Sequence, residues 1–137
     1  MAADCLFCQI AAGTHAAAIV FQDQHLLAFL DHRPLFPGHC LLIPRQHREV
    51  LADLPAEEIS PLFTTAQRLS QAVEQALGAE GSFVAINNRV SQSVPHLHIH
   101  VVPRKRKDGL RGFFWPRGKY GSDEEMEAVR QKLEKAL

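Results

Sequence analysis

The chain has 137 residues, which is enough for one compact domain with a hydrophobic core. Fifteen acidic and fifteen basic residues balance each other, and 46% of all residues are hydrophobic. This composition argues against a disordered chain and against a domain that binds nucleic acid through overall charge. No apolar stretch reaches the roughly 18 residues of a membrane span, and the first residues lack the features of a signal peptide. We therefore expect a cytoplasmic protein without a membrane partner.

The hydrophobic pattern predicts several strands and three helical segments. In chain order we expect a helical turn over 4–12, strands over 19–21, 26–30 and 40–43, a long helix over 55–77, strands over 83–86 and 97–102, and a terminal helix over 122–136. Pro44 and Pro103 are expected to end the third and fifth strands, and Gly78 the long helix. Ser122 with Glu125 predicts a capping box for the last helix. Antiparallel strands interrupted by a long helix are typical of an α+β domain, which we expect to span residues 1–137.

Three histidines alternate with apolar residues late in the chain, at His96, His98 and His100. Because residues two apart on a strand project from one face, the three imidazoles should share a surface while Leu97 and Ile99 enter the core. A solvated strand face is the alternative, but such a face normally carries Thr, Lys or Glu. Three adjacent rings would repel one another if all were protonated, so at least one should stay neutral and nucleophilic.

Cys5 and Cys8 form a Cys-x-x-Cys pair near the start of the chain. Two thiolates at this spacing can chelate one metal ion, but redox pairs share the same spacing, so both interpretations stay open. There is no second Cys-x-x-Cys, which excludes a ribbon-type zinc module. Cys40 lies within a predicted strand and is expected to act as a small buried hydrophobic residue.

Three segments of the sequence carry a family resemblance. Residues 92–102 read Gln-Ser-Val-Pro-His-Leu-His-Ile-His-Val-Val, residues 28–31 with 37–47 contain Phe-Leu-Asp and Pro-Gly-His, and residues 5–10 read Cys-Leu-Phe-Cys-Gln-Ile. These segments resemble the histidine triad (HIT) family, in particular its zinc-containing bacterial Hint-like branch, over nearly the whole chain. The resemblance implies a single HIT domain with a five-stranded antiparallel sheet and a long helix, paired in a homodimer into a ten-stranded sheet.

The resemblance also implies an activity. Family members attack the α-phosphate of purine nucleotide derivatives, of the nucleoside phosphoramidate or dinucleoside polyphosphate type, through a nucleotidyl-histidine intermediate. By position, His98 matches the nucleophile, His100 and His39 match histidines beside the phosphate, and Ser93 matches a leaving-group contact. The residues matched to nucleotide binding are Asp31, Asn87, Phe7, Ile10, His32, Leu41 and Gln92. Asp31 matches the carboxylate that holds the ribose hydroxyls, a suitable role for a group that accepts several hydrogen bonds.

Two departures from the family pattern leave details open. The loop between Asn87 and Ser93 is shorter than usual and lacks the family's glycines. His32 stands where an aliphatic residue usually contacts the base. The leaving group and the preferred base therefore stay open.

The resemblance extends to a structural zinc ion. Its zinc-containing members use the first histidine of the triad as a ligand, which implies a site of Cys5, Cys8, His47 and His96. Two thiolates and two imidazoles would fill the four positions of a closed zinc site. The alternative is a free dithiol.

Two other functions compete with an enzyme. A purine-nucleotide-binding regulatory module with little turnover could keep the same pocket. A nucleic-acid end-processing protein is the third hypothesis, and the balanced charge counts against it, so we expect no nucleic-acid partner.

Two further sequence features allow two interpretations each. The basic run 104–107 is either a solvated loop or a surface that steers an anionic nucleotide. The apolar cluster Phe113-Phe114-Trp115-Pro116 is either buried or lies over a pocket or a dimer interface.

Overall fold

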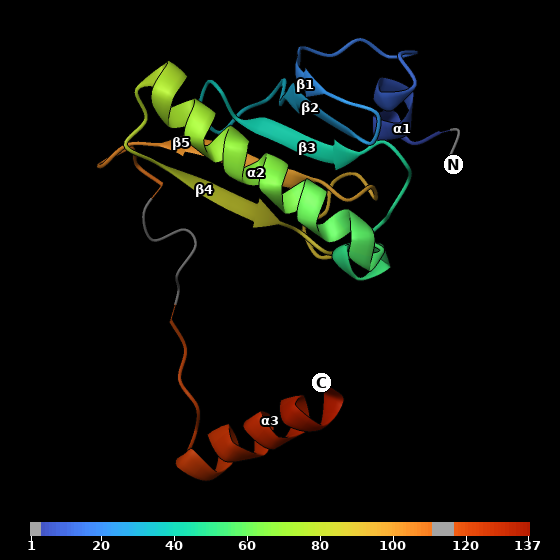
Figure 1. The fold of residues 1–137 in the computed structure, drawn as a ribbon. Helices are drawn as coiled ribbons and strands as arrows, with labels where there is room; N and C mark the ends of the chain where they lie inside the picture. Colours follow the sequence, from blue (N-terminus) through green and yellow to red (C-terminus); the bar gives the residue numbers. More distant parts are fainter. Residues whose placement is uncertain (1–3, 111–116) are drawn as a thin grey trace. The chain divides into compact units, whose positions relative to one another are not determined.

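The computed structural model describes residues 4–110 and 117–137. The chain forms two compact units, Met1–Arg106 and Lys107–Leu137. The first unit contains α1 (Leu6–Ala11), β1 (Ile19–Gln22), β2 (Leu26–Leu30), β3 (Cys40–Pro44), the 3-10 turn η1 (Leu51–Asp53), α2 (Ala56–Leu77), β4 (Gly81–Ile86) and β5 (Ile99–Arg104), and the second contains α3 (Asp123–Ala136) (Figure 1). No helix in the described parts of the chain is long and apolar enough to cross a membrane.

The five strands form one antiparallel sheet in the order β1-β2-β3-β5-β4. The central pairing of β3 with β5 places Leu41 opposite His100 and Leu42 opposite Ile99. The α+β class, the five-stranded antiparallel sheet and the long helix are therefore confirmed. β4 and β1 occupy the two edges of this sheet.

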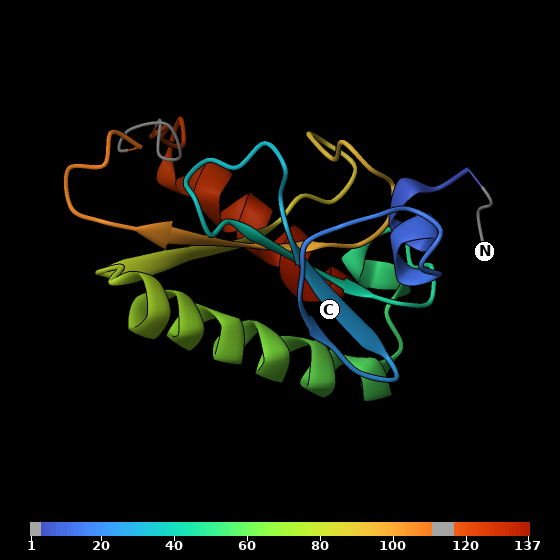
Figure 2. The same cartoon turned by 90° about the horizontal axis from the view of Figure 1, so that it is seen from above.

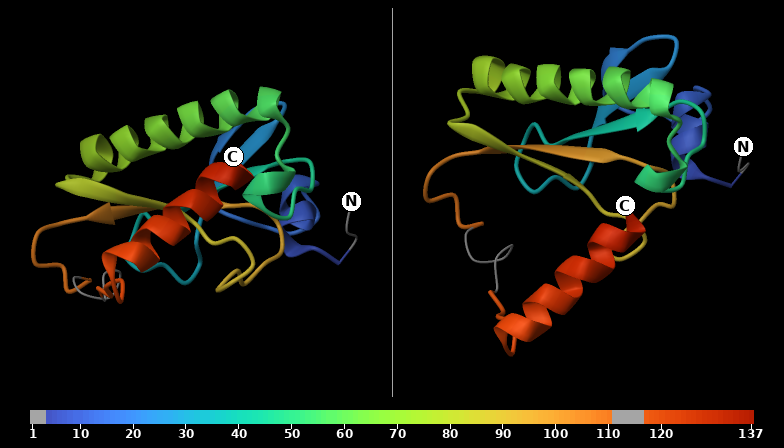
Figure 3. Two further views of the ribbon diagram at one scale, coloured as in Figure 1. Left: turned by 90° about the horizontal axis from the view of Figure 1, so that it is seen from below. Right: turned by 60° about the horizontal axis from the view of Figure 1, so that its bottom comes forward.

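One face of the sheet is covered by α2, which runs along β3, β4 and β5 (Figures 2 and 3). The helix buries an apolar stripe of Leu62, Ala66, Leu69 and Val73, spaced three or four residues apart as one helical face requires. This stripe packs against the strand residues that point toward α2, among them Leu42, Ile99 and Val101. Gly78 ends the helix in a left-handed conformation with φ 65°, as the sequence predicts.

The opposite face of the sheet holds the short helix α1. Phe7 and Ile10 pack against Phe29, Leu41 and Ile43, the alternate residues of β2 and β3. Arg45 fastens the end of this helix, because its Nη1 donates to the Ala11 carbonyl at 2.9 Å. The histidine-rich segment lies on this second face, since the Phe7 ring contacts the rings of both His96 and His98.

The fifth strand differs from the prediction. It was expected over 97–102 with Pro103 as its end, whereas β5 spans Ile99–Arg104 and includes the proline. Pro103 is tolerated because β3 pairs with β5 only as far as Val101, so at Pro103 the strand has its partner on the β4 side alone. His96 and His98 therefore precede the strand, although Leu97 and Ile99 still point into the core as expected. In the same way β3 includes Pro44, and β4 begins at Gly81 rather than at residue 83.

The second unit consists of α3 and the residues around it. Ser122 caps this helix, because its side chain accepts a hydrogen bond from the Glu125 N–H at 3.1 Å. The Glu125 carboxylate accepts in turn from the Gly121 N–H, so the capping box closes one residue earlier than its usual form. The cluster at residues 113–116 lies outside the described residues.

Candidate functional site

A cavity of about 710 Å³ opens on the α1 face of the sheet. This volume falls within the usual range for small-molecule pockets. Eight of the residues predicted for catalysis or nucleotide binding line it, and they are Phe7, Ile10, Asp31, His32, Leu41, Ser93, His98 and His100. His39, Asn87 and Gln92 are not among the lining residues. The structure therefore brings most of the predicted site together from α1, the loop after β2, β3, β5 and the loop before β5.

His98 is buried, and its proton has a defined position. Nδ1 lies 2.7 Å from the backbone carbonyl of His96, and a carbonyl can only accept a hydrogen bond, so Nδ1 carries the proton. Nε2 is then left with its lone pair. Burial lowers the pKa of this imidazole, while the bond to the His96 carbonyl acts in the opposite direction. The result is a neutral imidazole with a nucleophilic nitrogen on a pocket-lining side chain.

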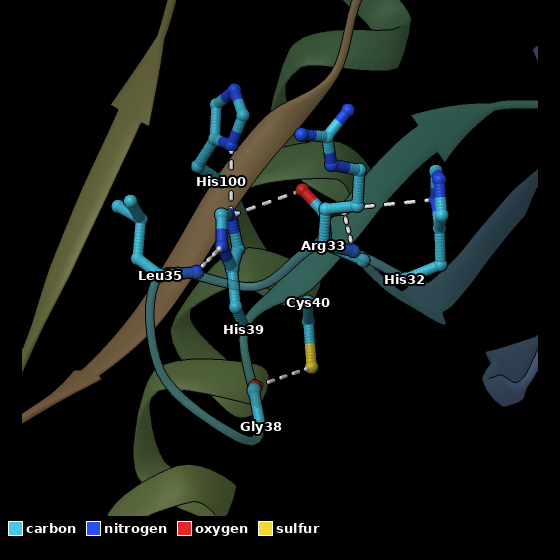
Figure 4. A network of polar contacts seen from close by, with 8 residues as sticks. His32, Arg33, Leu35, Gly38, His39, Cys40 and His100 are labelled. Atoms are coloured by element: carbon cyan, nitrogen blue, oxygen red, sulfur yellow. Dashed lines mark hydrogen bonds and ion pairs between the residues drawn. The ribbon is translucent and has the colours of Figure 1, made fainter.

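Leu35, His39 and His100 form a directed chain of hydrogen bonds (Figure 4), and His100 lines the pocket. The Leu35 N–H donates to His39 Nδ1 at 3.1 Å, so the proton of His39 is on Nε2. This Nε2–H donates to His100 Nδ1 at 2.9 Å, which leaves the proton of His100 on its own Nε2. His100 Nε2 is buried and has no hydrogen-bond partner among the described residues. A buried donor without a partner is costly in a folded protein, so this nitrogen is a candidate contact for a ligand oxygen.

The environment keeps both members of this histidine pair neutral near pH 7. Burial lowers the pKa of His100 to about 4, and the neighbouring rings of His98 and His39 add to this effect. Burial also lowers the pKa of His39, while the Asp31 carboxylate raises it. Neutral rings preserve the donor-to-acceptor order of the chain, because a protonated His39 could not accept the Leu35 N–H.

Asp31 follows the end of β2 and faces both the pocket and His39. Its Oδ1 accepts the Arg33 N–H at 2.9 Å, and its Oδ2 lies 3.9 Å from His39 Nε2. The side chain is one-fifth exposed, so it is held in place while still reachable by a ligand. The loop returns to β3 through Gly38, which has φ 101°, and a Cβ at this position would lie 2.3 Å from Leu77 Cδ1. Only glycine allows this close turn immediately before His39.

Gln92 holds the loop that precedes the histidine segment. Its Oε1 accepts the Arg89 N–H at 2.9 Å, and its Nε2 donates to the Glu49 carbonyl at 2.7 Å. These bonds stabilise a tight loop in which Arg89 and Ser91 both have positive φ. The next residue, Ser93, lines the pocket. The Gln92 amide thus joins the backbone of its own loop at Arg89 to the distant backbone at Glu49.

The four predicted metal ligands lie together near the N-terminal end of α1. One donor atom from each of Cys5, Cys8, His47 and His96 lies within 4.8 Å of the others. His96 Nδ1 is 3.5 Å from both sulfur atoms, and His47 Nδ1 is 3.2 Å from Cys8 Sγ. A tetrahedral zinc site has edges of about 3.5 Å between nitrogen and sulfur ligands, so the spacing suits the ion.

The hydrogen bonds of His96 support the same fit. Its Nε2 lies 2.8 Å from the Pro44 carbonyl and must therefore donate to it, which leaves Nδ1 with a lone pair directed at the two sulfur atoms. Four ligands leave no open coordination position. The donor set therefore suits a structural ion rather than a catalytic one.

Several pocket residues were not identified from the sequence. They are Leu6, His15, Ala16, Ala17, Ala18, Phe29, Leu30 and Val94. Leu6 and Phe29 belong to elements that the pattern does predict, and their distance from the histidine segment along the chain conceals their place in the pocket. Residues 15–18 lie in a connection without periodicity, so the sequence offered no signal for them. Cys40 is buried within β3, as expected.

The chain is similar to enzymes in organisms that are distant from one another. It is 33% identical over 109 residues to adenylylsulfatase HINT3 of Arabidopsis thaliana, a match that covers 78% of this chain and 55% of that protein. It is 39% identical over 92 residues to an asymmetrical bis(5'-nucleosyl)-tetraphosphatase of Schizosaccharomyces pombe, covering 66% of this chain and 50% of that enzyme.

Solved structures match the fold over nearly the whole chain. A HIT family protein of Bacillus subtilis superimposes with a TM-score of 0.88 and 31% identity, covering 98% of this chain and 97% of that one. A zinc-bound histidine triad protein of Mycobacterium smegmatis gives a TM-score of 0.74 and 34% identity, covering 98% of both chains. The model of the HIT domain family matches residues 12–107. From the histidine segment, the five-stranded sheet and these matches together, it follows that the chain belongs to the HIT domain family.

Proposed function

We propose that this protein hydrolyses or transfers the nucleotidyl group of a purine nucleotide derivative, with His98 as the nucleophile toward the α-phosphorus. The supporting observation is the pairing of two complementary nitrogen atoms. His98 Nε2 offers a lone pair and His100 Nε2–H offers a donor, on rings whose centroids are 4.9 Å apart. The names of two relatives, an adenylylsulfatase and a bis(5'-nucleosyl)-tetraphosphatase, describe nucleotide substrates of the same kind.

The first step forms a bond between His98 Nε2 and phosphorus. The bond from phosphorus to the leaving group breaks, and its electron pair departs with the leaving group. His98 becomes positively charged, and the His96 carbonyl that accepts its Nδ1–H stabilises this charge. The hydroxyl of Ser93 donates to the leaving group. Charge on the phosphate oxygens is met by the Nε2–H of His100, which His39 orients from behind.

The second step returns the histidine to its starting state. A water molecule attacks phosphorus, and the bond to His98 Nε2 breaks with its electron pair remaining on nitrogen. The oxygen atom of water becomes part of the nucleoside monophosphate. A proton from water accounts for the proton that the leaving group carries away. No other reactant is needed.

The rest of the pocket would hold the nucleoside. Asp31 accepts hydrogen bonds from the ribose hydroxyls, because its carboxylate is held by the Arg33 N–H and remains reachable. Phe7, Ile10, Leu41 and His32 enclose the base, and apolar walls reward the large surface of a purine. Asn87 and Gln92 are assigned here by resemblance, and the contacts of Gln92 support a role in holding the loop before Ser93.

A zinc ion is proposed for the Cys5, Cys8, His47 and His96 cluster, as in the zinc-containing Hint-like branch. When bound, the ion would supply a cross-link between α1 and two distant segments of the chain. It would also fix His96, whose carbonyl orients His98. The zinc-bound structure from Mycobacterium smegmatis supports the presence of such an ion in a relative.

A homodimer is proposed through the β4 edge of the sheet. In the described residues β4 pairs with β5 on one side and has no strand on the other. Ser82 and Val84 point to the α2 face, since Ser82 Oγ bonds Ser70 Oγ at 2.6 Å. Val84 is 44% exposed, and Ile59 and Phe63 are exposed on the same side of α2 as Ser70. An open edge beside exposed apolar side chains is suited to pairing with a second copy into a ten-stranded sheet. A single HIT domain over residues 1–137 is proposed as the unit that pairs.

The decisive experiment measures release of AMP from adenosine 5'-phosphoramidate and from diadenosine tetraphosphate. His98→Ala should lower the rate by at least about a thousandfold, because the nucleophile itself is lost. Mass spectrometry after a quench without acid should find AMP attached to His98 in the wild-type protein. His25→Ala is the matched control, since His25 is exposed and does not line the cavity. Turnover by His98→Ala at the wild-type rate would refute the mechanism, and tight AMP binding without turnover by the wild type would favour a regulatory module.

A further inference from the structure

The pocket has two polar side chains outside its reactive end. Asp31, Ser93, His98 and His100 form that end, and the other lining side chains are apolar except for two histidines, His15 and His32. A slot with only apolar walls would accept any purine ring to a similar degree. A polar atom on such a wall is therefore the feature able to distinguish one base from another.

The imidazole of His15 has a defined proton position. Its Nδ1 lies 3.0 Å from the carbonyl of Ala16, and because a carbonyl only accepts, Nδ1 carries the proton. Nε2 is then a hydrogen-bond acceptor. The side chain is exposed and lines the cavity, so a ligand in the pocket can reach it.

The backbone around His15 is fastened to α1. Three donors converge on the Gln9 carbonyl, namely the Thr14 N–H at 2.9 Å, the Thr14 hydroxyl at 3.2 Å and the His15 N–H at 3.3 Å. Gly13 makes the turn with φ 78°, and its N–H donates to the Ile10 carbonyl at 3.1 Å. Ile10 itself lines the pocket, so the backbone of His15 is held beside the wall, and the bond to the Ala16 carbonyl orients its ring. A group held in advance costs less conformational entropy when it binds.

His32 is a weaker candidate for the same task. Its side chain is 85% exposed, and its Nδ1 lies 4.0 Å from Asp31 Oδ1. It therefore lies beside the Asp31 carboxylate, which we propose binds the ribose hydroxyls. Within the described parts of the chain His15 forms no ion pair with a carboxylate, and it offers a directed acceptor.

We propose that His15 determines base specificity, its Nε2 accepting a hydrogen bond from the exocyclic amino group of an aminopurine nucleotide. This inference rests on the proposed function, since it takes the cavity to be the nucleotide pocket. The amino group of adenine or guanine is a donor that matches a lone acceptor on an otherwise apolar wall. A purine without that group leaves the acceptor facing apolar surface.

Isothermal titration calorimetry with matched nucleotides tests the proposal. Purine riboside 5'-monophosphate differs from AMP only in having hydrogen in place of the amino group, and IMP lacks the 2-amino group of GMP. The wild-type protein should bind at least one amino nucleotide about 3- to 12-fold more tightly than its partner, the gain of one typical hydrogen bond. His15→Ala should abolish this preference, His15→Gln should restore part of it through its amide oxygen, and the control His25→Ala should keep it.

The outcomes separate this inference from the proposed function. Equal affinities within both nucleotide pairs in the wild type, or an unchanged preference in His15→Ala, overturn the role of His15. If AMP still binds more tightly than deoxy-AMP and this difference disappears in Asp31→Ala, the nucleotide pocket stands while the inference on His15 fails. Absence of binding by every nucleotide overturns both.

Discussion

At the scale of single residues, the histidines differ through the carbonyl, N–H or ring that each one contacts. His98 and His96 both donate to backbone carbonyls, but through different ring nitrogens, so one presents Nε2 to the pocket and the other presents Nδ1 to the sulfur atoms. His100 Nδ1 accepts a hydrogen bond from the His39 Nε2–H, so His100 presents its own Nε2–H as a donor. In the function proposed above, four chemically identical side chains thus serve as a nucleophile, a metal ligand, a donor and the group that orients it.

The His39–His100 pair makes stability depend on pH. The pKa of His100 is lowered to about 4 in the folded state from an ordinary 6.5, so between these values the unfolded chain binds more protons. The stabilisation is complete above about pH 6.5, and it is lost as the pH falls through the folded value. When the pH is lowered from 7 to 5, the free energy of unfolding should fall in both proteins. The fall should be about 1–2 kcal/mol larger in the wild type than in His100→Asn.

Urea unfolding of both proteins at pH 7, 6 and 5 measures this difference. Acid effects elsewhere in the molecule, those at the metal cluster included, cancel in the comparison. His25→Asn, which alters an exposed histidine, should follow the wild-type curve. Parallel curves for wild type and His100→Asn would show that His100 is not the group responsible.

At the scale of secondary-structure elements, α1 depends on the rest of the molecule. It has six residues and no side-chain cap, and so short a helix is unstable alone in water. It is held by the burial of Phe7, Cys8 and Ile10, by Arg45 on the Ala11 carbonyl, and by the cysteines beside His47 and His96. Because Phe7 and Ile10 also line the pocket, the proposed metal cluster and the proposed base wall share one helix.

Removing one thiolate should therefore affect both the metal and the fold. We expect Cys8→Ser to lower the zinc content from about one ion per chain to a small fraction. We also expect the melting temperature to fall by about 5–10 °C, corresponding to about 2 kcal/mol in a domain of this size. Elemental analysis and a thermal melt, on protein purified without chelator, measure the two effects. Cys40→Ser is the control, since Cys40 is buried on the α2 face of the sheet. Absence of zinc from the wild-type protein would remove the proposed site.

At the scale of the whole molecule, the two sheet edges have different surroundings. Beside β4 the exposed apolar residues Val84, Ile59 and Phe63 gather on one side. The β1 edge carries Ile19 and Val20, and there α2 contributes a charged side chain, the Arg68 guanidinium over the Phe21 ring. This asymmetry is the reason for assigning the dimer contact to β4.

A single charge on the β4 edge should therefore separate the proposed dimer. Light scattering at micromolar concentration should give twice the 15.3 kDa of the chain for the wild type. Val84→Lys should give the mass of one chain, because a buried lysine at a strand-to-strand contact has no partner charge. Val20→Lys makes the same change at an exposed valine of the opposite edge and should leave the dimer intact. A wild-type particle of one chain would exclude the dimer.

Much of this protein could be predicted from its sequence, because periodicity reports which face of an element is buried. The alternation around Leu97 and Ile99 and the helical spacing from Leu62 to Val73 predicted the sheet and its covering helix. The tertiary structure alone decided where each ring proton lies and that Gln92 holds the loop. It also decided that Pro103 belongs to β5, because β3 has already ended there, and that His15 reaches the pocket. Several of these features depend on contacts between segments far apart in the chain, such as His39 with His100 and Gln92 with Glu49, and local residue patterns carry no information about such contacts. Others depend on backbone geometry next to the residue, such as the His96 carbonyl beside His98, which the order of residues does not show.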